Sequence, residues 1–322
     1  MAVFTEVTPA QAQQIASHLG LGAVSQLRGI EGGIENTNYF LSTQNDQAAE
    51  SHYVLTLFER LQAEQLPFYL YLMKHLAQAG IPVPDPQANA YGDILLSVGG
   101  KPATVVNKLS GKSQLQPETR HCEAVGDMLA RMHLAGQDYG REQPNLRGLA
   151  WWNDTVPLVM PFLDENQSAL IQTELAWQNH LAASPEAKAL PMGPVHADLF
   201  RDNVMFEGDK LTGFFDFYFA GCDTWLFDVA VCLNDWCIDL ATGQHDERRA
   251  QAFTQAYQAV RAFTPAEHQL FPSLLRAAAL RFWISRLWDF YLPRQASLLK
   301  PHDPQHFERV LRERVNHPWR PA

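Results

Sequence analysis

The chain has 322 residues, 46% of them hydrophobic, and a formal net charge of −10 at neutral pH. That length allows a substantial core in one large or two moderate domains. The acidic balance argues against nucleic acid, which is bound mainly by Lys and Arg at phosphates. The sequence has no run of about eighteen apolar residues to span a membrane, and its first residues do not resemble a signal peptide. We therefore expect a cytoplasmic protein without nucleic-acid or membrane partners.

The N-terminal third has the pattern of a helix followed by a small antiparallel sheet. Thr8 and Pro9 start a helix that ends near Gly20, and strands follow at 24–30, 38–42 and 53–58. A sheet with a glycine-bearing turn can fold its backbone amides over phosphates, although this turn is neither a Walker A nor a GxGxxG sequence. We expect phosphate contacts from residues of and next to this turn: Gly32, Gly33, Asn36 and Asn38.

A helix at 66–79, closed by Gly80, and two strands at 94–97 and 103–107 complete this part. The pattern then breaks at 109–113, which predicts a nucleotide-binding lobe at 1–108 and a catalytic, substrate-binding lobe at 109–322. A chain crossing between the lobes would present its backbone to an adenine edge, here at Asn107, Lys108 and Leu109.

Beyond Pro117 the pattern is mainly helical. One helix carries Cys122 on its apolar face and ends at Gly136, and another spans 163–182. The segment that begins at Trp151 looks variable, and no helix or strand is predicted there. Asp228 precedes an apolar helix, where a capping role is expected, and His133 is expected to pack or cap. A last helix at 274–292 carries arginines that require carboxylate partners. The four cysteines form no Cys-x-x-Cys pair, so we expect reduced, mostly buried thiols and no zinc site.

The segment from Val195 to Asp216 predicts strand, loop, strand, turn and strand, with the reversal at Gly208. Asp198 follows His196 by two positions, Asn203 follows Asp198 by five, and Asp216 ends the next apolar run. Kinase-type phosphoryl transfer uses this pattern: the Asp of His-x-Asp-x-x-x-x-Asn accepts the proton of the attacking hydroxyl, and the Asn and a later Asp bind metal ions.

The negative charge of the phosphates explains why these residue types are needed. A carboxylate can approach a triphosphate only with divalent cations between them, and Mg²⁺ prefers the oxygens that Asn203 and Asp216 supply. The pattern thus predicts Asp198 as the base, with ATP and Mg²⁺ as cosubstrate and cofactor. A polar pair at a strand end, followed by a turn, is the structural alternative, which the complete spacing disfavours.

Several strings carry a family resemblance that extends over nearly the whole chain. Residues 196–203 (HADLFRDN), 215–218 (FDFY) and 228–230 (DVA) resemble the aminoglycoside phosphotransferase and choline kinase superfamily. Within it, residues 32–39 (GGIENTNY), 53–59 (YVLTLFE) and 66–69 (LPFY) are similar to the bacterial homoserine kinases.

The resemblance implies an α+β, two-lobed protein-kinase-like fold with a small antiparallel-sheet N-lobe and a larger, mainly helical C-lobe. The implied reaction transfers the γ-phosphoryl of ATP to L-homoserine, which gives O-phospho-L-homoserine on the way to threonine. By position it also implies Asp198 as base, Asn203 and Asp216 as magnesium ligands, and structural support of the catalytic loop by His196 and Asp228.

One position departs from the kinase pattern. Kinases carry a lysine on the third strand that holds the α/β-phosphates. In this chain Thr56 occupies that position, and it carries no charge. Arg28, Arg60, Lys108 or the metal ions could compensate, and the sequence does not select among them.

A zwitterionic substrate requires a cation for its carboxylate and an acceptor for its ammonium group. The sequence offers Arg201, Arg281 and Arg286 for the first and Asp202, Asp223 and Asp235 for the second. Two alternatives stay open. The same chemistry could act on an aminoglycoside, choline or methylthioribose, or the chain could be a non-catalytic nucleotide-binding module, as the missing lysine would allow.

Overall fold

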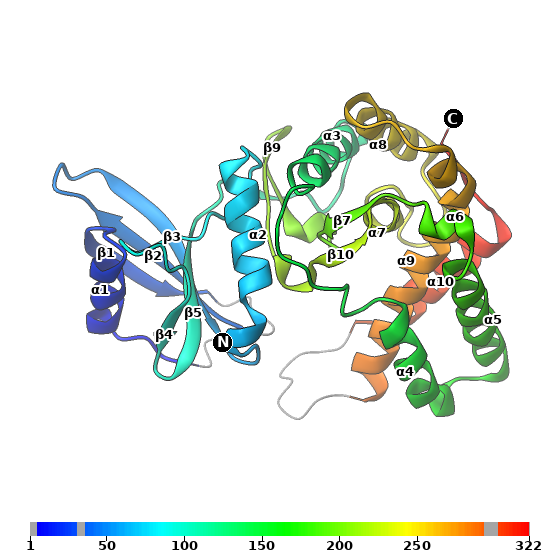
Figure 1. Cartoon of the computed structure of the whole chain (residues 1–322), viewed down its shortest axis with the longest axis horizontal. Coiled ribbons are helices and arrows are strands. Elements are labelled where there is room, and N and C mark those ends of the chain that lie inside the picture. The colour runs from blue at the N-terminus through cyan, green and yellow to red at the C-terminus, as the bar shows by residue number, and fades with distance from the viewer. Residues whose placement is uncertain (1–4, 31–35, 293–301, 322) are drawn as a thin grey trace. The chain divides into compact units, whose positions relative to one another are not determined.

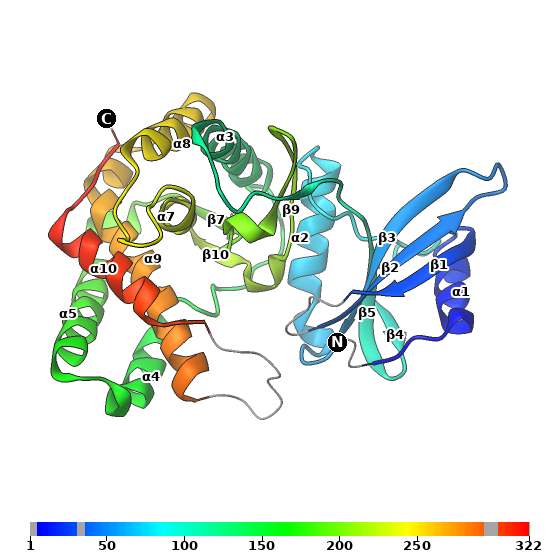
Figure 2. The same ribbon diagram turned by 180° about the vertical axis from the view of Figure 1, so that it is seen from behind.

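The structure of the chain is a computed structural model that describes residues 5–30, 36–292 and 302–321. The chain divides into two compact units, Met1–Ser110 and Gly111–Ala322. The first combines an antiparallel sheet with helices, and the second is mainly helical (Figures 1 and 2). This composition confirms the predicted α+β class, with an antiparallel sheet in the first unit and mainly helices in the second.

The sheet of the first unit has five antiparallel strands. Their order is β1 (Ala23–Gly29), β2 (Asn36–Gln44), β3 (Glu50–Phe58), β5 (Lys101–Asn107) and β4 (Leu96–Val98). β2 and β3 are longer than expected, because backbone pairing continues through polar residues from Asn36↔Phe58 to Gln44↔Glu50. A polar stretch obscures a strand in the sequence but does not prevent its ladder of hydrogen bonds.

Helix α1 (Pro9–His18) covers one face of this sheet and builds the core there. It begins at the expected Thr8 capping box, and its Ile15 packs with Tyr39, Leu41 and Leu55 of the sheet. Because side chains alternate along a strand, Asn38 lies on the sheet face opposite to Tyr39 and Leu41. The 3₁₀ turn η1 (Ala63–Gln65) and helix α2 (Pro67–Gln78) follow β3.

Eight α-helices are described in the second unit. They are α3 (Thr119–Ala135), α4 (Leu149–Val159), α5 (Glu165–Ala182), α6 (Pro185–Lys188), α7 (Trp225–Trp236), α8 (Glu247–Val260), α9 (Pro265–Tyr291) and α10 (Gln305–Asn316). Every residue of α7 is buried, and both views show this helix in the interior of the unit. Helices α3 and α8 pack closely at Gly126, where a Cβ atom would lie 2.2 Å from the carbonyl oxygen of Phe253.

Two small sheets position the loops of interest within this helical unit. β7 (Met192–Val195) pairs with β10 (Gly221–Thr224), and β6 (Lys112–Ser113), β8 (Val204–Glu207) and β9 (Lys210–Phe214) form the other sheet. Gly208 makes the reversal between β8 and β9 at φ +59°. The 3₁₀ turns are η2 (Met160–Phe162), η3 (Arg201–Asn203) and η4 (Phe217–Phe219).

Two helical segments differ from expectation. The segment around Trp151 is helix α4, in which Trp152 is buried against Phe227 at a ring-centroid distance of 6.4 Å. Pro157 inside α4 hid this helix in the sequence, since proline usually interrupts helices. The Thr264 capping box, which the sequence also indicates, starts helix α9 at Pro265, and the helix continues past Pro272 into the segment expected as a separate helix at 274–292.

No described helix is long and apolar enough to cross a membrane. All four cysteines are free thiols, and three of them, Cys122, Cys232 and Cys237, are buried. Burial raises the pKa of the Cys232 thiol well above its usual range, so this group stays protonated and packs as a small apolar side chain.

Candidate active site

The loop from β7 to β8 holds Asp198 and Asn203 side by side. Ala197 at the start of the loop has the left-handed backbone angle φ +61°, and η3 ends the loop at Asn203. The amide nitrogen of Asn203 donates to the backbone oxygen of Asp198 at 2.8 Å and lies 3.4 Å from its carboxylate. Because the side-chain nitrogen of Asn203 is used in these contacts, its side-chain oxygen is the atom that can bind a cation.

Hydrogen bonds tie Asp216 to the same loop. The backbone N–H of Phe215, next to Asp216, donates to the backbone oxygen of Asn203 at 3.1 Å. His196 donates from Nε2 to the backbone oxygen of Phe215 at 2.8 Å, and its Nδ1 accepts the backbone N–H of Asp198 at 3.3 Å. These partners assign a neutral imidazole with its proton on Nε2, and burial lowers the pKa of His196 accordingly.

Asp228, on the first turn of α7, hydrogen-bonds to the backbone at the start of the loop. Its carboxylate accepts the backbone N–H of His196 at 2.9 Å and that of Ala197 at 2.8 Å. The helix cap of α7 is Thr224, so the expected capping role of Asp228 was wrong, and its carboxylate serves the loop instead. Such charge-assisted bonds fix the backbone that precedes Asp198.

His133 is the buried partner of Asp228 that the sequence did not reveal. Its Nε2 lies 3.0 Å from the Asp228 carboxylate, and its Nδ1 lies 2.8 Å from the hydroxyl of Tyr257. Burial alone would raise the pKa of Asp228, but the His133 hydrogen bond and the backbone donors outweigh it and lower the pKa. Asp228 therefore stays a carboxylate that can accept all of these bonds.

Asp198 has an acidity suited to proton transfer. Burial raises its pKa to about 7, nearby Arg281 opposes the increase, and the charges of Asp216 and Asp202 add to it. Its side chain is nevertheless partly accessible to solvent. A carboxylate with a pKa near neutrality can accept a proton more readily than an ordinary aspartate.

The predicted substrate residues fall into two groups: three whose side chains hydrogen-bond within the protein, and three that lie near the loop of Asp198. Arg201 and Asp235 bind each other: Nε of Arg201 lies 3.0 Å from the Asp235 carboxylate, which also accepts the Arg201 backbone N–H at 2.8 Å. Asp223 accepts from the amide of Asn145 at 2.8 Å and from a backbone N–H. The side chains of Arg201, Asp235 and Asp223 thus hydrogen-bond within the protein and stabilise the fold.

Arg281 and Arg286 on α9 and the exposed Asp202 form the second group. Arg281 is 3% exposed, and Asp198 interacts electrostatically with both arginines. Asp202 is also coupled to Arg286. These residues thus gather near the loop of Asp198, as the sequence interpretation requires of a substrate site.

In the first unit, Thr56 pairs across the strands with Asn38, and its hydroxyl donates to the Asn38 side chain at 2.7 Å. Asn36 begins β2, whereas Gly32 and Gly33 lie outside the described residues. At the end of β5, the side chain of Asn107 accepts the backbone N–H of Asp85, and Lys108 donates its backbone N–H to His52 at 2.9 Å. Leu109 follows in an irregular segment.

The cations near this sheet include one that the sequence interpretation missed. Arg28 and Lys108 both lie over the ring of Phe40, at 5.2 and 4.8 Å from its centroid. Lys101 forms an ion pair with Glu59, which also accepts a hydrogen bond from Thr37 at 2.5 Å. The pairing of Lys101 with a residue 42 positions away depends on the sheet register, which no local pattern could reveal.

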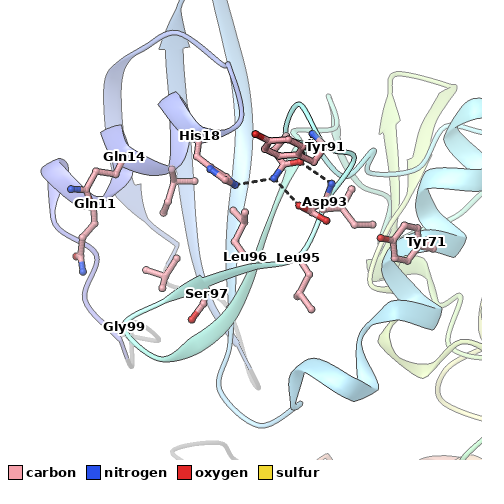
Figure 3. A pocket seen from close by; sticks show the side chains of 14 residues that line it. Gln11, Gln14, His18, Tyr71, Tyr91, Asp93, Leu95, Leu96, Ser97 and Gly99 are labelled. Carbon is pink, nitrogen blue, oxygen red and sulfur yellow. Dashed lines mark hydrogen bonds between the residues drawn. The ribbon is translucent and has the colours of Figure 1, made fainter.

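A pocket of approximately 630 Å³ lies in the first unit, away from the predicted residues. His18 and Asp93 are among the residues that line it (Figure 3), and the side chain of Asn89 lies 3.1 Å from that of His18 and 3.0 Å from that of Asp93. None of the side chains predicted to bind nucleotide lines this pocket. We assign it no part in the chemistry.

The fold and the Asp198, Asn203 and Asp216 arrangement define a protein-kinase-like phosphotransferase. The chain belongs to the phosphotransferase enzyme family, whose model matches residues 26–263. It is 64% identical over 319 residues to a homoserine kinase of Polaromonas naphthalenivorans (strain CJ2), with 99% of each chain covered. It is 60% identical to a homoserine kinase of Ralstonia pickettii (strain 12J), with 98% of this chain and 96% of the relative covered.

Solved structures show the same fold at low sequence identity. The amicoumacin kinase hAmiN, solved in complex with AMP-PNP, Ca²⁺ and Ami, has a TM-score of 0.66 and 17% identity, with 91% of this chain and 89% of that chain covered. The family match over residues 26–263 and the full-length homoserine kinase relatives confirm the resemblance inferred from the sequence strings.

Proposed function

We propose that this protein is an ATP-dependent homoserine kinase, which transfers the γ-phosphoryl group of ATP to the hydroxyl of L-homoserine. The products would be O-phospho-L-homoserine, a precursor of threonine, and ADP. The observation that carries this proposal is the 64% identity to a homoserine kinase over 99% of both chains. The adjacent Asp198, Asn203 and Asp216 supply the residue types that kinase chemistry uses.

In the proposed reaction the homoserine hydroxyl oxygen forms a bond to the γ-phosphorus, and the bond from that phosphorus to the bridging oxygen of ADP breaks. Asp198 accepts the hydroxyl proton. Its pKa of about 7 allows it to be ionised at neutral pH and still hold the proton afterwards. Asn203 donates toward Asp198 and orients it, while Asp228 and His196 hold the loop.

Asn203 and Asp216 are the residues that would hold Mg²⁺. Among the described residues, no three His, Cys, Asp or Glu side chains gather as a metal site. This donor set fits Mg²⁺, which binds nucleotides through one or two protein oxygens and fills its other positions with phosphate and water. When bound, the ion neutralises phosphate charge.

The first unit would bind the nucleotide, and the second would carry the acceptor and the base, with the lobes bounded at 1–108 and 109–322. Within the first unit we propose Asn36, Asn38 and Thr56 for phosphate and residues 107–109 for the adenine edge; Gly32 and Gly33 stay in this proposal from the sequence alone. Lys101 joins Arg28, Arg60 and Lys108 as a cation that could replace the missing third-strand lysine. We also propose a cytoplasmic location, in keeping with the similarity to homoserine kinases.

An acceptor screen tests the function directly. Purified protein with ATP and Mg²⁺ is given L-homoserine, choline, methylthioribose or an aminoglycoside, and ADP production is measured. We expect turnover with homoserine at least about tenfold more efficient than with the others. Faster turnover on another acceptor would reassign the substrate, and no turnover on any of them would favour a non-catalytic nucleotide-binding module.

A further inference from the structure

Arg281 carries a buried hydrogen-bonding edge to which no described part of the chain binds. Its side chain is 3% exposed, and neither Nε nor Nη2 has a hydrogen-bond partner among the described residues. A buried guanidinium without partners is costly, because its N–H groups lose water and gain nothing in exchange. A ligand that offers two acceptor oxygens would remove this cost.

The same edge of the guanidinium binds carboxylates elsewhere in this chain. Arg276, five residues earlier on α9, holds Glu174 through Nε at 2.8 Å and Nη2 at 2.6 Å. Arg131 holds Asp127 through the same two atoms at 2.7 and 3.1 Å. In both pairs one carboxylate oxygen faces each nitrogen, which is the bidentate geometry that arginine favours. Arg281 thus presents the edge that would accept a carboxylate.

Two aromatic contacts place the Arg281 guanidinium close to segments next to the proposed catalytic residues. The Arg281 guanidinium lies 5.3 Å from the ring centroid of Phe219, three residues after Asp216, and 3.8 Å from that of Phe282. The Phe282 ring in turn lies 4.4 Å from that of Phe200, two residues after Asp198. The rings hold the planar group in place, and they connect it to both arms that carry the proposed catalytic side chains.

The surroundings favour an anionic ligand. Arg147 and Arg286 interact electrostatically with Arg281, and Asp198 and Asp289 are the acidic groups coupled to it. Burial lowers the pKa of Arg281 to about 10, which still leaves it positively charged at neutral pH. Because residues 5–30, 36–292 and 302–321 supply no carboxylate to the Nε and Nη2 atoms of Arg281, the ligand chemistry indicated is a small carboxylate that arrives with the acceptor.

We propose that Arg281 binds the α-carboxylate of the hydroxylated acceptor through Nε and Nη2, and thereby selects amino-acid alcohols over amines that lack a carboxylate. This inference rests on the proposed kinase function and adds the residue that determines the acceptor class. Acceptors such as choline have no group for this edge and would leave the buried guanidinium unpaired. Discrimination by an unpaired buried polar group is typically strong.

The test compares two acceptors that differ only in this group: L-homoserine and 3-amino-1-propanol, which is homoserine without its carboxylate. For the wild-type enzyme we expect kcat/KM to be about 100-fold or more higher for homoserine. In Arg281→Ala this ratio should collapse toward one, because homoserine should lose far more kcat/KM than 3-amino-1-propanol does, mainly through a higher KM for homoserine. Arg281→Lys retains the charge but not the two parallel N–H groups of the guanidinium, so it should recover only part of the preference for homoserine over 3-amino-1-propanol.

Arg276→Lys is the matched control on the same helix, because its carboxylate partner belongs to the protein. It is expected to lower the melting temperature and to leave the ratio of the two acceptors unchanged. Added methylguanidinium should restore homoserine turnover to Arg281→Ala, a result that a merely structural role would not give.

The possible outcomes separate the inference from the function on which it rests. If Arg281 only balanced the charge of Asp198 or contacted phosphate, both acceptors would lose rate equally, and the inference would be wrong. Equal wild-type rates on the two acceptors would overturn it without any variant, even if the variants fail to fold. If wild-type enzyme does not phosphorylate homoserine at all, the proposed function itself fails.

Discussion

Asp228 accepts the backbone N–H of Ala197 at 2.8 Å, and Ala197 holds the left-handed angle φ +61°. A residue with a Cβ atom adopts this conformation only at a cost. The bond from a fully buried carboxylate compensates that cost and fixes the backbone one residue before Asp198. The position of the proposed base therefore depends on Asp228 of helix α7, which bonds to the backbone of the loop.

Replacing Asp228 by Asn tests this dependence. The two carboxylate oxygens accept from His196, Ala197 and His133, and an amide can replace only one of these oxygens as an acceptor. We expect the free energy of unfolding to fall by about 2–4 kcal/mol and kcat to fall about 10–100-fold, with little change in KM for homoserine. Denaturant unfolding and steady-state kinetics measure the two effects.

Asp246→Asn is the control for Asp228→Asn. Asp246 caps α8 by accepting the backbone N–H of Arg249 at 3.1 Å, and Asn caps helices equally well. Its kcat should match that of the wild-type enzyme. Wild-type kcat in Asp228→Asn would contradict the positioning role.

The second prediction concerns Asp198 as the base. Asp198→Asn should lower kcat by about 10²–10⁴-fold, because an amide cannot accept the hydroxyl proton. In the wild-type enzyme, kcat/KM should fall as the pH is lowered through about 7, since only the ionised carboxylate of Asp198 accepts a proton. The variant's residual rate should lack this inflection. A wild-type profile that stays flat down to pH 5 would exclude a base with this pKa.

The third prediction uses the same raised pKa as a stability effect. Burial raises the folded-state pKa of Asp198 to about 7 from an ordinary value of 3.8, so folding favours the protonated form. The stability that the protonated Asp198 contributes is fully present below pH 3.8, the ordinary pKa, and is lost as the pH rises through 7. Without nucleotide and metal, Asp198→Asn should therefore gain stability over the wild-type protein between pH 5 and 8, on the order of 2 kcal/mol. A stability difference that does not change with pH would contradict the raised pKa.

The fourth prediction concerns the metal ligands. Asp216→Asn replaces a charged oxygen by a neutral one, so the Mg²⁺ concentration for half-maximal activity should rise at least about tenfold. Asn203→Ala should act in the same direction and also lower kcat, because the amide that orients Asp198 is lost. Mg²⁺ titrations of activity measure both. Asp209→Asn, in the exposed turn between β8 and β9, is the control and should leave the Mg²⁺ dependence of activity unchanged. If Asp216→Asn also had the Mg²⁺ dependence of the wild-type enzyme, Asp216 would not be a metal ligand.

The sequence was most informative where function is encoded by local spacing. His196, Asp198 and Asn203 lie in one loop, and a single hairpin separates them from Asp216, so strand pattern and spacing together predicted that they meet. The α1 capping box and the strands of the first unit were predictable for the same reason, because caps and alternation are local signals.

Contacts between distant segments were beyond the reach of these patterns. His133 meets Asp228 across 95 positions, and Lys101 meets Glu59 across the sheet. Local reasoning gave Asp228 a capping role, but the helix cap is Thr224. The sequence also could not separate Arg201 from Arg281, which are chemically equal until packing gives one of them to Asp235 and leaves an edge of the other unpaired.

The most direct test of the account is ³¹P NMR of a reaction that contains ATP, Mg²⁺ and L-homoserine, run with wild-type protein and with Asp198→Asn. We expect a new phosphomonoester resonance of O-phosphohomoserine that grows with ADP in the wild-type reaction and is nearly absent with the variant. ADP without that resonance, or an equal resonance from Asp198→Asn, would contradict it.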